Sequence, residues 1–254
     1  MSNYIITEKK GKIFWIRFNR PEKYNAINSE MYQSLVAAFD EADKVEEVMI
    51  TVITGTGKYY SAGSDFSLSE MEKMSQRSAG TEAGYKMWAD KIIRHTKLVV
   101  ALVNGPALGI AVTTLALFDV VLSSDQATYY CPFTQLGLCP EAASSYSFVQ
   151  IMGYQRAVRL ALLSEKMSAQ EAYDVGLVTK VIPHDRFEEE SGKLLSNYSK
   201  LAHQSVIVSK RLLRPQSQVD HLLTVNGQEY EVLMKQFVCE ETVERMLSKF
   251  TSKI

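Results

Sequence analysis

The stretch LVVALVNGPALGIAVTTLALFDVVLSS, residues 98–124, decides the fold class. It begins with the apolar run Leu98–Val103 and ends with the β-rich run Val120–Ser124. Residues 104–106 (NGP) interrupt it, and the apolar residues that follow predict a buried helix from about Ala107. Strands that are buried on both faces of a parallel sheet have this nearly continuous apolar character. The stretch therefore predicts a strand-helix-strand unit of an α/β protein, and not a segment that spans a membrane.

The residues that precede this unit predict further strands and a helix. Residues 4–8 and Ile13–Phe18 favour a hairpin, and residues 48–54 favour a buried strand. Asn28 precedes a pattern of apolar residues at helical spacing that extends to Ala42. The amino-terminal half thus alternates strands with helices, as an α/β fold requires.

Two helices are predicted downstream of the unit, and a surface segment is predicted upstream of it. Pro140 favours the start of a helix that stops near Gly153. Ser168 and Glu171 have the spacing of a capping box, which marks the start of another helix. Residues 66–84 are rich in Ser, Glu, Lys and Gly, a composition that is typical of a mobile surface segment.

The order of these elements divides the chain into two regions. Residues 178–182 form the last β-rich run, and from Phe187 onward the pattern is helical, with a break at Pro215. We therefore expect an α/β core over residues 1–183 and a helical carboxyl-terminal region over residues 184–254.

Composition and charge exclude several classes of function. The chain has 254 residues, and its 28 Lys and Arg against 29 Asp and Glu give a formal net charge of −1. This balance provides no basic field for a nucleic-acid backbone and no polybasic patch for a membrane surface. The three cysteines and four histidines lack metal-ligand spacing, so we expect no metal site, no disulfide framework and a reducing compartment.

Two glycine-containing loops follow apolar strands. The first loop covers residues 59–65 (YYSAGSD), and the second loop covers residues 104–110 (NGPALGI). A dinucleotide-binding GxGxxG pattern is excluded, because Tyr60 stands where the third glycine is needed. Loops at adjacent strand ends can direct backbone N–H groups at one point, as an oxyanion hole requires. The same residues are also compatible with ordinary strand-to-helix turns.

Four short motifs occur in order along residues 4–182. They are NRP with NAIN (residues 19–21 and 25–28), SAGSD (residues 61–65), NGPALG (residues 104–109) and FDVV (residues 118–121). In sequence and spacing they resemble the crotonase (enoyl-CoA hydratase/isomerase) superfamily. The resemblance implies a spiral of ββα units that binds an acyl-CoA thioester, with coenzyme A as part of the substrate and no separate cofactor. It also implies a trimerisation role for the helical carboxyl-terminal region, so a homotrimer or a dimer of trimers is expected.

The resemblance also assigns candidate site residues. It implies that the backbone N–H groups of Ala62 and Ile110 hold the thioester oxygen. The predicted substrate-binding residues are Ala26, Ser61, Ala62, Gly63, Ser64, Asp65, Gly109, Ile110 and Phe133. Asp65 and Asn104 are also expected to brace the two loops through side-chain hydrogen bonds to the backbone. Lys23 is a candidate contact for a phosphate of coenzyme A.

The carboxylates predict the reaction. Hydratases of this superfamily carry two glutamates that hold a water molecule, and this chain has Thr113 and Phe133 at the matching positions. Residues 135–146 around Glu141 resemble the segment that carries the catalytic glutamate of the superfamily's Δ3,Δ2-enoyl-CoA isomerases. The resemblance thus implies conversion of 3-enoyl-CoA to 2-trans-enoyl-CoA in the β-oxidation of unsaturated fatty acids. Glu141 would carry the proton from C2 to C4.

Other interpretations stay open at this point. A glutamate after a proline also favours a helix start through the helix dipole, without any catalytic role. A crotonase-like chain can be a non-catalytic module that binds acyl-CoA or protein, as in chromodomain proteins. The resemblance implies, however, that those modules carry Asp at the position where this chain has Glu141. A dienoyl-CoA isomerase would be expected to use additional acids where this chain has Thr113 and Phe133.

The last three residues resemble a targeting signal. Ser252, Lys253 and Ile254 differ from the peroxisomal signal Ser-Lys-Leu only in the final aliphatic residue. Together with the resemblance, they predict recognition by a peroxisomal import receptor and a peroxisomal location. Without such recognition, the cytoplasm or the mitochondrial matrix is expected.

Overall fold

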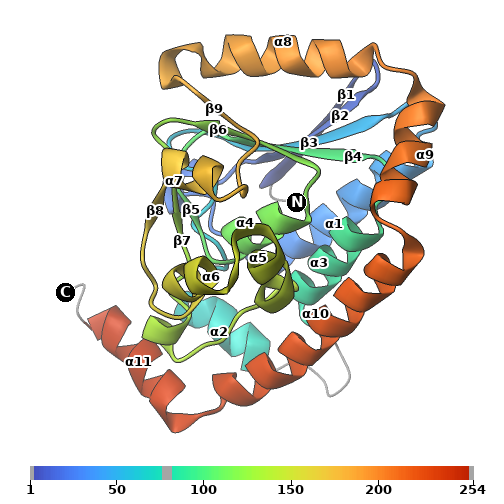
Figure 1. The fold of residues 1–254 in the computed structure, drawn as a ribbon. Coiled ribbons are helices and arrows are strands. Elements are labelled where there is room, and N and C mark those ends of the chain that lie inside the picture. Colours follow the sequence, from blue (N-terminus) through green and yellow to red (C-terminus); the bar gives the residue numbers. More distant parts are fainter. Residues whose placement is uncertain (1–2, 76–81, 252–254) are drawn as a thin grey trace.

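Within residues 3–75 and 82–251, which this computed structural model describes, six strands form a central sheet (Figure 1). In sheet order they are β1 (Ile5–Lys10), β2 (Ile13–Phe18), β3 (Ile50–Gly55), β4 (Leu98–Val103), β6 (Val120–Ser124) and β9 (Lys180–Ile182). β1 and β2 form an antiparallel hairpin, and all other neighbours in this sheet are parallel. The two runs of the 98–124 stretch are adjacent strands, with Val100 opposite Val120. The predicted parallel sheet is therefore confirmed.

A smaller sheet accompanies the first. It contains β5 (Ala107–Leu108), β7 (Thr128–Tyr130) and β8 (Met167–Ser168). The prediction of a helix from Ala107 was wrong, because Ala107 and Leu108 pair with β7 as a short strand. Gly109 has a φ of +53°, and only after this break do α4 (Ile110–Thr113) and a 3-10 helix (Thr114–Leu117) follow.

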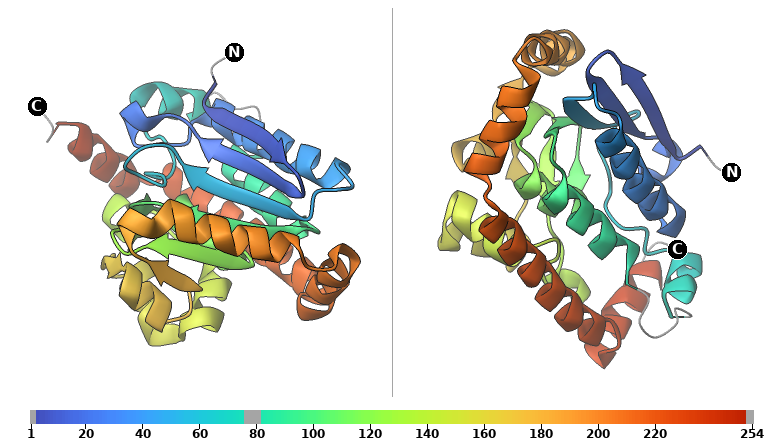
Figure 2. Two further views of the ribbon diagram at one scale, coloured as in Figure 1. Left: turned by 90° about the horizontal axis from the view of Figure 1, so that it is seen from above. Right: turned by 90° about the vertical axis from the view of Figure 1, so that its right-hand side faces the viewer.

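Helices cover both faces of the central sheet (Figures 1 and 2). Besides the short α4, the α-helices in the described residues are α1 (Ser29–Lys44), α2 (Leu68–Ser75), α3 (Gly84–Arg94), α5 (Ser144–Met152), α6 (Tyr154–Ala161), α7 (Ala169–Asp174), α8 (Phe187–Ser199), α9 (His203–Leu213), α10 (Gln216–Phe237) and α11 (Glu240–Thr251). Figure 1 shows α8 over one face and α1 with α3 over the other. Val52 and Val100 pack in a small core with Leu195 of α8, whereas Phe39 and Trp88 belong to the larger core beneath the sheet.

Several local signals have the predicted effect. Asn28 caps α1, since its side-chain oxygen accepts a hydrogen bond from the amide of Met31 at 2.9 Å. Ser168 and Glu171 form the predicted capping box of α7. α5 ends before Gly153, and Pro215 separates α9 from α10. These positions were predictable because each depends on residues close in sequence.

Two segments differ from the prediction. The helix expected at Pro140 begins only at Ser144, because Ala142 and Ala143 both adopt the left-handed conformation, with φ of +57° and +58°. The surface segment predicted over residues 66–84 contains α2, and residues 76–81 lie outside the described part of the chain. No helix within the described residues is both long and apolar enough to cross a membrane.

Candidate active site

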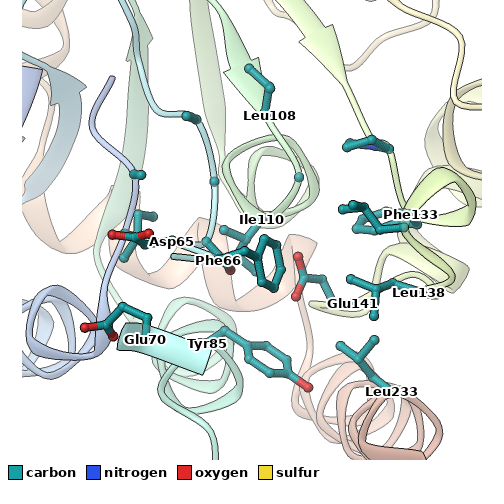
Figure 3. Close-up of a pocket in the computed structure, with 18 of the residues that line it drawn as sticks. Asp65, Phe66, Glu70, Tyr85, Leu108, Ile110, Phe133, Leu138, Glu141 and Leu233 are labelled. Carbon is teal, nitrogen blue, oxygen red and sulfur yellow. The ribbon is translucent and has the colours of Figure 1, made fainter. Parts of the chain in front are cut away.

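A cavity of about 490 Å³ lies between the two glycine-containing loops and the carboxyl-terminal helices. Of the predicted site residues, those that line it are Ala26, Ala62, Gly63, Ser64, Asp65, Gly109, Ile110, Phe133 and Glu141. Figure 3 shows Glu141 facing the space next to Ile110 and Phe66, with Phe133 and Leu138 beside it. The structure thus brings together residues from four separate parts of the sequence.

Three residues that the sequence analysis considered for the site, Ser61, Thr113 and Lys23, do not line the cavity. Ser61 is fully buried behind the cavity wall, where its hydroxyl donates to the carbonyl oxygen of Asn25 at 2.8 Å and accepts from the amide of Gly63 at 3.1 Å. Thr113 is also fully buried, and its hydroxyl donates to the carbonyl oxygen of Ile110. Both side chains support backbone near the cavity without lining it. Lys23 is exposed at the end of a short 3-10 helix, Pro21–Lys23.

The first loop is held by a buried asparagine. The Asn25 side chain donates to the carbonyl oxygens of Thr56 and Tyr59, at 3.0 and 2.8 Å, and accepts from the amide of Arg20 at 2.9 Å. Asn25 itself is fully buried in the left-handed region, at a φ of +57°. Asparagine is one of the few residues with a side chain that adopts this conformation readily. Its amide group therefore fixes the start of the first loop.

The two loops lie directly against each other. The amide of Leu108 donates to the carbonyl oxygen of Ser61 at 3.0 Å, and Ser61 forms a parallel bridge with Ala107. Gly63 has a φ of +82°, and a Cβ atom at this position would lie 2.6 Å from the carbonyl oxygen of Leu108. Only glycine fits this close approach and this backbone conformation together. The predicted proximity of the two loops is therefore present.

The free amide donors differ in one position from the prediction. The N–H of Ala62 donates to the carbonyl oxygen of Tyr24 at 2.9 Å, so it is engaged within the protein, which is at odds with its predicted role. Among the described residues, the amides of Ser64 and Ile110 have no such acceptor, and both residues line the cavity. Ile110 is the first residue of α4, where amide groups lack an intrahelical partner. In the stretches of the two loops that line the cavity, residues 62–65 and 108–110, Ser64 and Ile110 are thus the residues whose amides have no acceptor among the described residues.

Asp65 and Asn104 brace the loops as predicted. Asp65 forms an ion pair with Arg20 at 2.6 Å and accepts from the amide of Ser67 at 2.9 Å. Burial raises the pKa of Asp65, but the hydrogen bonds from Arg20 and Ser67 outweigh it, so the pKa lies below its usual value. Asn104 accepts from the amide of Gly55 at 3.1 Å. Asp65 is therefore an ionised structural group with its oxygens already occupied.

Glu141 is in a different situation. Only 7% of it is exposed, and its carboxylate has no hydrogen-bond or ion-pair partner among the described residues. Burial, with a smaller contribution from the negative charge of Glu229, raises the pKa of Glu141 from 4.5 to about 8. Glu141 does not belong to a helix, because α5 begins three residues later. The helix-start interpretation of this residue is therefore wrong.

A third carboxylate in the cavity wall is also occupied. Glu70 of α2 accepts from the amide of Ser29 at 2.9 Å and from the Lys73 ammonium group at 2.6 Å. Burial raises the pKa of Glu70, but the hydrogen bonds from these partners outweigh it, so the pKa lies below its usual value. Of the three carboxylates that line the cavity in the described part of the chain, only Glu141 is without a partner.

Comparison with known proteins places this geometry in a family. The profile of the family described as enoyl-CoA hydratase/isomerase matches residues 8–253. The chain belongs to this family. It is similar to the crystal structure of an enoyl-CoA hydratase/isomerase from Pseudoalteromonas atlantica T6c, with a TM-score of 0.90 and 29% identity over 98% of both chains. The predicted crotonase-like fold is thereby confirmed, whereas the trimer stays a prediction.

Relatives of this enoyl-CoA hydratase/isomerase family member include isomerases. Enoyl-CoA delta isomerase 2 of Rattus norvegicus is 39% identical over 99% of this chain, which spans 64% of the rat protein. A second relative, "Enoyl-CoA delta isomerase 3, peroxisomal" of Mus musculus, is 41% identical over 93% of this chain and 74% of the mouse protein. These relatives support an enzyme of the enoyl-CoA isomerase or hydratase type.

Sequence reasoning missed the carboxyl-terminal wall of this family member's cavity. Leu233 and Phe237 of α10 and Met246 of α11 line it, so the site uses both of the predicted regions. Glu229 of α10, which acts on Glu141, was missed as well. A signal existed, because residues 222, 226, 229 and 233 recur at helical spacing and form the buried face of α10. Two polar residues in this otherwise apolar face indicate contacts with other elements.

Proposed function

We propose that this protein is a Δ3,Δ2-enoyl-CoA isomerase that converts 3-enoyl-CoA to 2-trans-enoyl-CoA. One observation carries the proposal: a single buried carboxylate without a partner, Glu141, shares a cavity with two unoccupied amide donors. Relatives named enoyl-CoA delta isomerase, at 36–41% identity, support it. Isomerisation needs one base and one site for negative charge, and this cavity offers that combination.

The proposed reaction starts at C2 of the acyl chain. The Glu141 carboxylate removes a C2 proton, and the electrons of that bond form the C1–C2 double bond of a dienolate. The negative charge moves to the thioester oxygen, which accepts hydrogen bonds from the amides of Ser64 and Ile110. When the carbonyl group reforms, the electrons of the C1–C2 double bond move to form the C2–C3 double bond. The electrons of the former C3–C4 double bond then bind the proton that Glu141 returns to C4. Substrate and product therefore have the same composition, and no cofactor is consumed.

The raised pKa of Glu141 suits this role. A thioester α-proton is only weakly acidic, so a carboxylate with a pKa of about 8 is a stronger acceptor than an ordinary glutamate. The apolar side chains of Phe133 and Leu138 beside it reduce hydration of the charged form. Because the base must be ionised, we expect kcat/KM, which reports the free enzyme, to increase as the pH rises through about 8.

Hydration of 2-enoyl-CoA is disfavoured by the same geometry. A hydratase must hold a water molecule against the substrate, and a pair of acid-base groups serves that purpose. Phe133 lines the cavity with an apolar ring, and Thr113 does not line it. Asp65 and Glu70 are occupied by Arg20 and Lys73. We therefore expect negligible formation of 3-hydroxyacyl-CoA.

The decisive experiment uses Glu141→Gln, which keeps the shape of the side chain and removes its basic oxygen. Purified protein is incubated with 3-enoyl-CoA and, separately, with 2-enoyl-CoA, and conjugation and hydration are followed independently. We expect kcat for isomerisation to fall by about 10²–10⁴-fold, the contribution of a positioned acid-base group. Binding of acyl-CoA should be unchanged, because the amide donors remain in place.

The controls separate the alternatives. Glu171→Gln changes a glutamate that accepts from the amide of Ser168, the N-cap residue of α7, at an exposed site that does not line the cavity, and it should leave kcat unchanged. Near-normal turnover in folded Glu141→Gln protein would contradict the proposed base. Acyl-CoA binding by wild-type protein without any turnover would favour the non-catalytic binding module instead.

Location and assembly belong to the proposal as well. A peroxisomal location is supported by the name of the mouse relative. The tripeptide Ser252, Lys253 and Ile254, predicted to bind an import receptor, lies outside the described residues. A reporter that carries the last ten residues of this chain should accumulate in peroxisomes, and a cytosolic distribution would contradict the address. Sedimentation should give the mass of a trimer or of a dimer of trimers.

A further inference from the structure

Glu229 forms an unusual link between α10 and the segment that carries Glu141. Its two carboxylate oxygens accept hydrogen bonds from the amides of Ala143, at 2.6 Å, and Ser145, at 2.8 Å. These amides belong to the start of α5, where backbone donors have no intrahelical partner. Glu229 is only 8% exposed, and the bonds join residues 84 and 86 positions apart in sequence. One side chain of the carboxyl-terminal region thus caps a helix of the core.

The capped segment is conformationally demanding. Ala142 and Ala143, the two residues that follow Glu141, are both left-handed, a conformation that alanine rarely adopts. Neither is in a regular element, and both are fully buried. The Glu141 side chain, directly before this turn, points into the cavity (Figure 3). Such a turn persists only where surrounding contacts determine it, and Glu229 supplies a bond to its second residue.

We infer that Glu229 is the positioning residue of Glu141: it holds the left-handed turn that aims the base, and it keeps a second carboxylate close to it. The inference rests on the proposed isomerase function for its catalytic meaning. The effect of Glu229 on the pKa of Glu141 does not depend on that function and can be measured without turnover. α10 is then part of the catalytic apparatus and not only a covering helix.

The titratable groups that face Glu141 come from several elements. Glu229 of α10 opposes ionisation of Glu141 and raises its pKa, in addition to burial. Tyr85 of α3 and the thiols of Cys131 and Cys139 also face it, and burial raises the pKa of each of these three groups, that of Cys139 to about 11. These three groups are therefore neutral near pH 8.

The remaining carboxylates of the cavity do not alter this balance. Asp65 and Glu70 line the opposite side, and each is paired with a cation, Arg20 and Lys73 respectively. Burial raises the pKa of Glu229 above its usual value and outweighs its hydrogen bonds, but the two amide bonds still favour its ionised form, a support that Glu141 lacks. Glu229 is thus the charged partner, and Glu141 holds its proton to higher pH.

The test compares Glu229→Gln with wild-type protein in two measurements. The pH profile of kcat/KM, which reports the ligand-free enzyme, should keep its shape, but its acidic limb should move from about 8 to lower pH by about one unit, because one like charge has been removed. The plateau of kcat should fall about tenfold, since the base is weaker and less well aimed. Glutamine can accept only one of the two amide bonds.

The second measurement is independent of activity. The protein is labelled with ¹³C at the glutamate carboxyl carbons, and the resonance that is absent from Glu141→Gln is titrated. Its midpoint should fall in Glu229→Gln by the same amount as the acidic limb. If wild-type protein does not isomerise 3-enoyl-CoA, the proposed function fails, and this titration still decides the role of Glu229. An unchanged midpoint in folded Glu229→Gln protein would overturn the inference.

A double variant separates aiming from charge and guards against misfolding. In Ala143→Gly/Glu229→Gln, glycine adopts the left-handed conformation without strain, so the turn can form without its cap. We expect the plateau of kcat to recover at least threefold while the acidic limb stays low. Glu171→Gln, which weakens the cap of α7, should lower Tm without moving the limb. A limb that stays near pH 8 in the double variant would also overturn the inference.

Discussion

The two sides of the cavity are built in opposite ways. On the side of the two loops, the side chains of Asn25, Asp65 and Asn104 form hydrogen bonds with backbone groups, and Asp65 also forms an ion pair with Arg20. On the other side, Glu141 extends from a left-handed turn into apolar surroundings without a partner of its own. The first side is stabilised by its polar groups, and the second carries an uncompensated one.

This difference teaches how one cavity can serve both halves of a proton-transfer reaction. Donors that receive negative charge must be fixed before the reaction, and a dense hydrogen-bond network provides that rigidity. A base must keep its affinity for a proton, and hydrogen bonds to its carboxylate would lower its pKa. Asp65 and Glu141 show the contrast directly, since partners lower the pKa of the first and burial raises that of the second.

The prediction with the largest expected effect is that ionised Glu141 lowers the free energy of unfolding of the protein. Between pH 4.5 and about 8 the folded protein retains a proton on Glu141 that the unfolded chain has lost. Wild-type stability should therefore fall by about 1.4 kcal/mol per pH unit in this interval through this group alone. Glu141→Gln does not titrate, so its advantage should grow with pH to about 4–5 kcal/mol at most above pH 8.

Chemical denaturation at pH 5 and pH 8.5 checks this sign. At pH 5 the wild-type protein and Glu141→Gln should have nearly equal free energies of unfolding. Glu229 is present in both proteins, so its own titration largely cancels in the difference. Equal stabilities at pH 8.5 would show that Glu141 has found a stabilising partner, and the contrast between the two sides would fail.

The next effect concerns the loop side. In Gly63→Ala, the new Cβ atom would lie 2.6 Å from the carbonyl oxygen of Leu108, at a φ of +82° that alanine disfavours. The loops must separate, which displaces the amide of Ser64 that follows Gly63. We expect kcat to fall by about 10²–10³-fold, the usual cost of one oxyanion donor.

A matched glycine variant controls for the added methyl group. A Cβ atom at Gly192, in the middle of α8, would meet nothing within 4 Å. Gly192→Ala should leave kcat unchanged and increase stability by about 0.5–1 kcal/mol, because alanine favours a helix. Normal turnover in Gly63→Ala would mean that the loop contact is unimportant for the reaction.

The smallest effect distinguishes backbone from side chain at Ser64. Its hydroxyl shares a hydrogen bond of 2.7 Å with Tyr32, and Ser64→Ala removes this bond while keeping the amide. We expect a loss of about 0.5–1.5 kcal/mol in stability. The value of kcat should change less than about threefold, because the proposed donor is the backbone N–H group. A much larger fall in kcat would assign the hydroxyl group a direct role.

The loop side was largely predictable from the sequence. Asn104 follows β4 directly, Gly63 and Asp65 lie in the loop that follows β3, and parallel strands bring the loops at their carboxyl ends together. The choice of amide was not predictable, since the N–H of Ala62 is engaged by Tyr24 and that of Ser64 is free. Which amide is free depends on backbone pairing with residues about forty positions away.

The side of Glu141 was predictable only in part. The resemblance pointed to Glu141 itself, but Pro140 suggested a helix that in fact begins at Ser144. Glu229 lies 88 positions further along the chain, and nothing local connects it to the turn at Ala142 and Ala143. Contacts of this kind arise from the packing of α10 against α5, which residue patterns do not specify.

By itself, the sequence determined the parallel sheet, the capped helices and the two glycine-containing loops, because these follow from apolar periodicity and from residues that act on near neighbours. The tertiary structure alone decided that Glu141 is buried without a partner, with a raised pKa, and that Ser64 presents a free amide. Both properties depend on which groups surround an atom in space, and so on burial and charge contributed by distant segments.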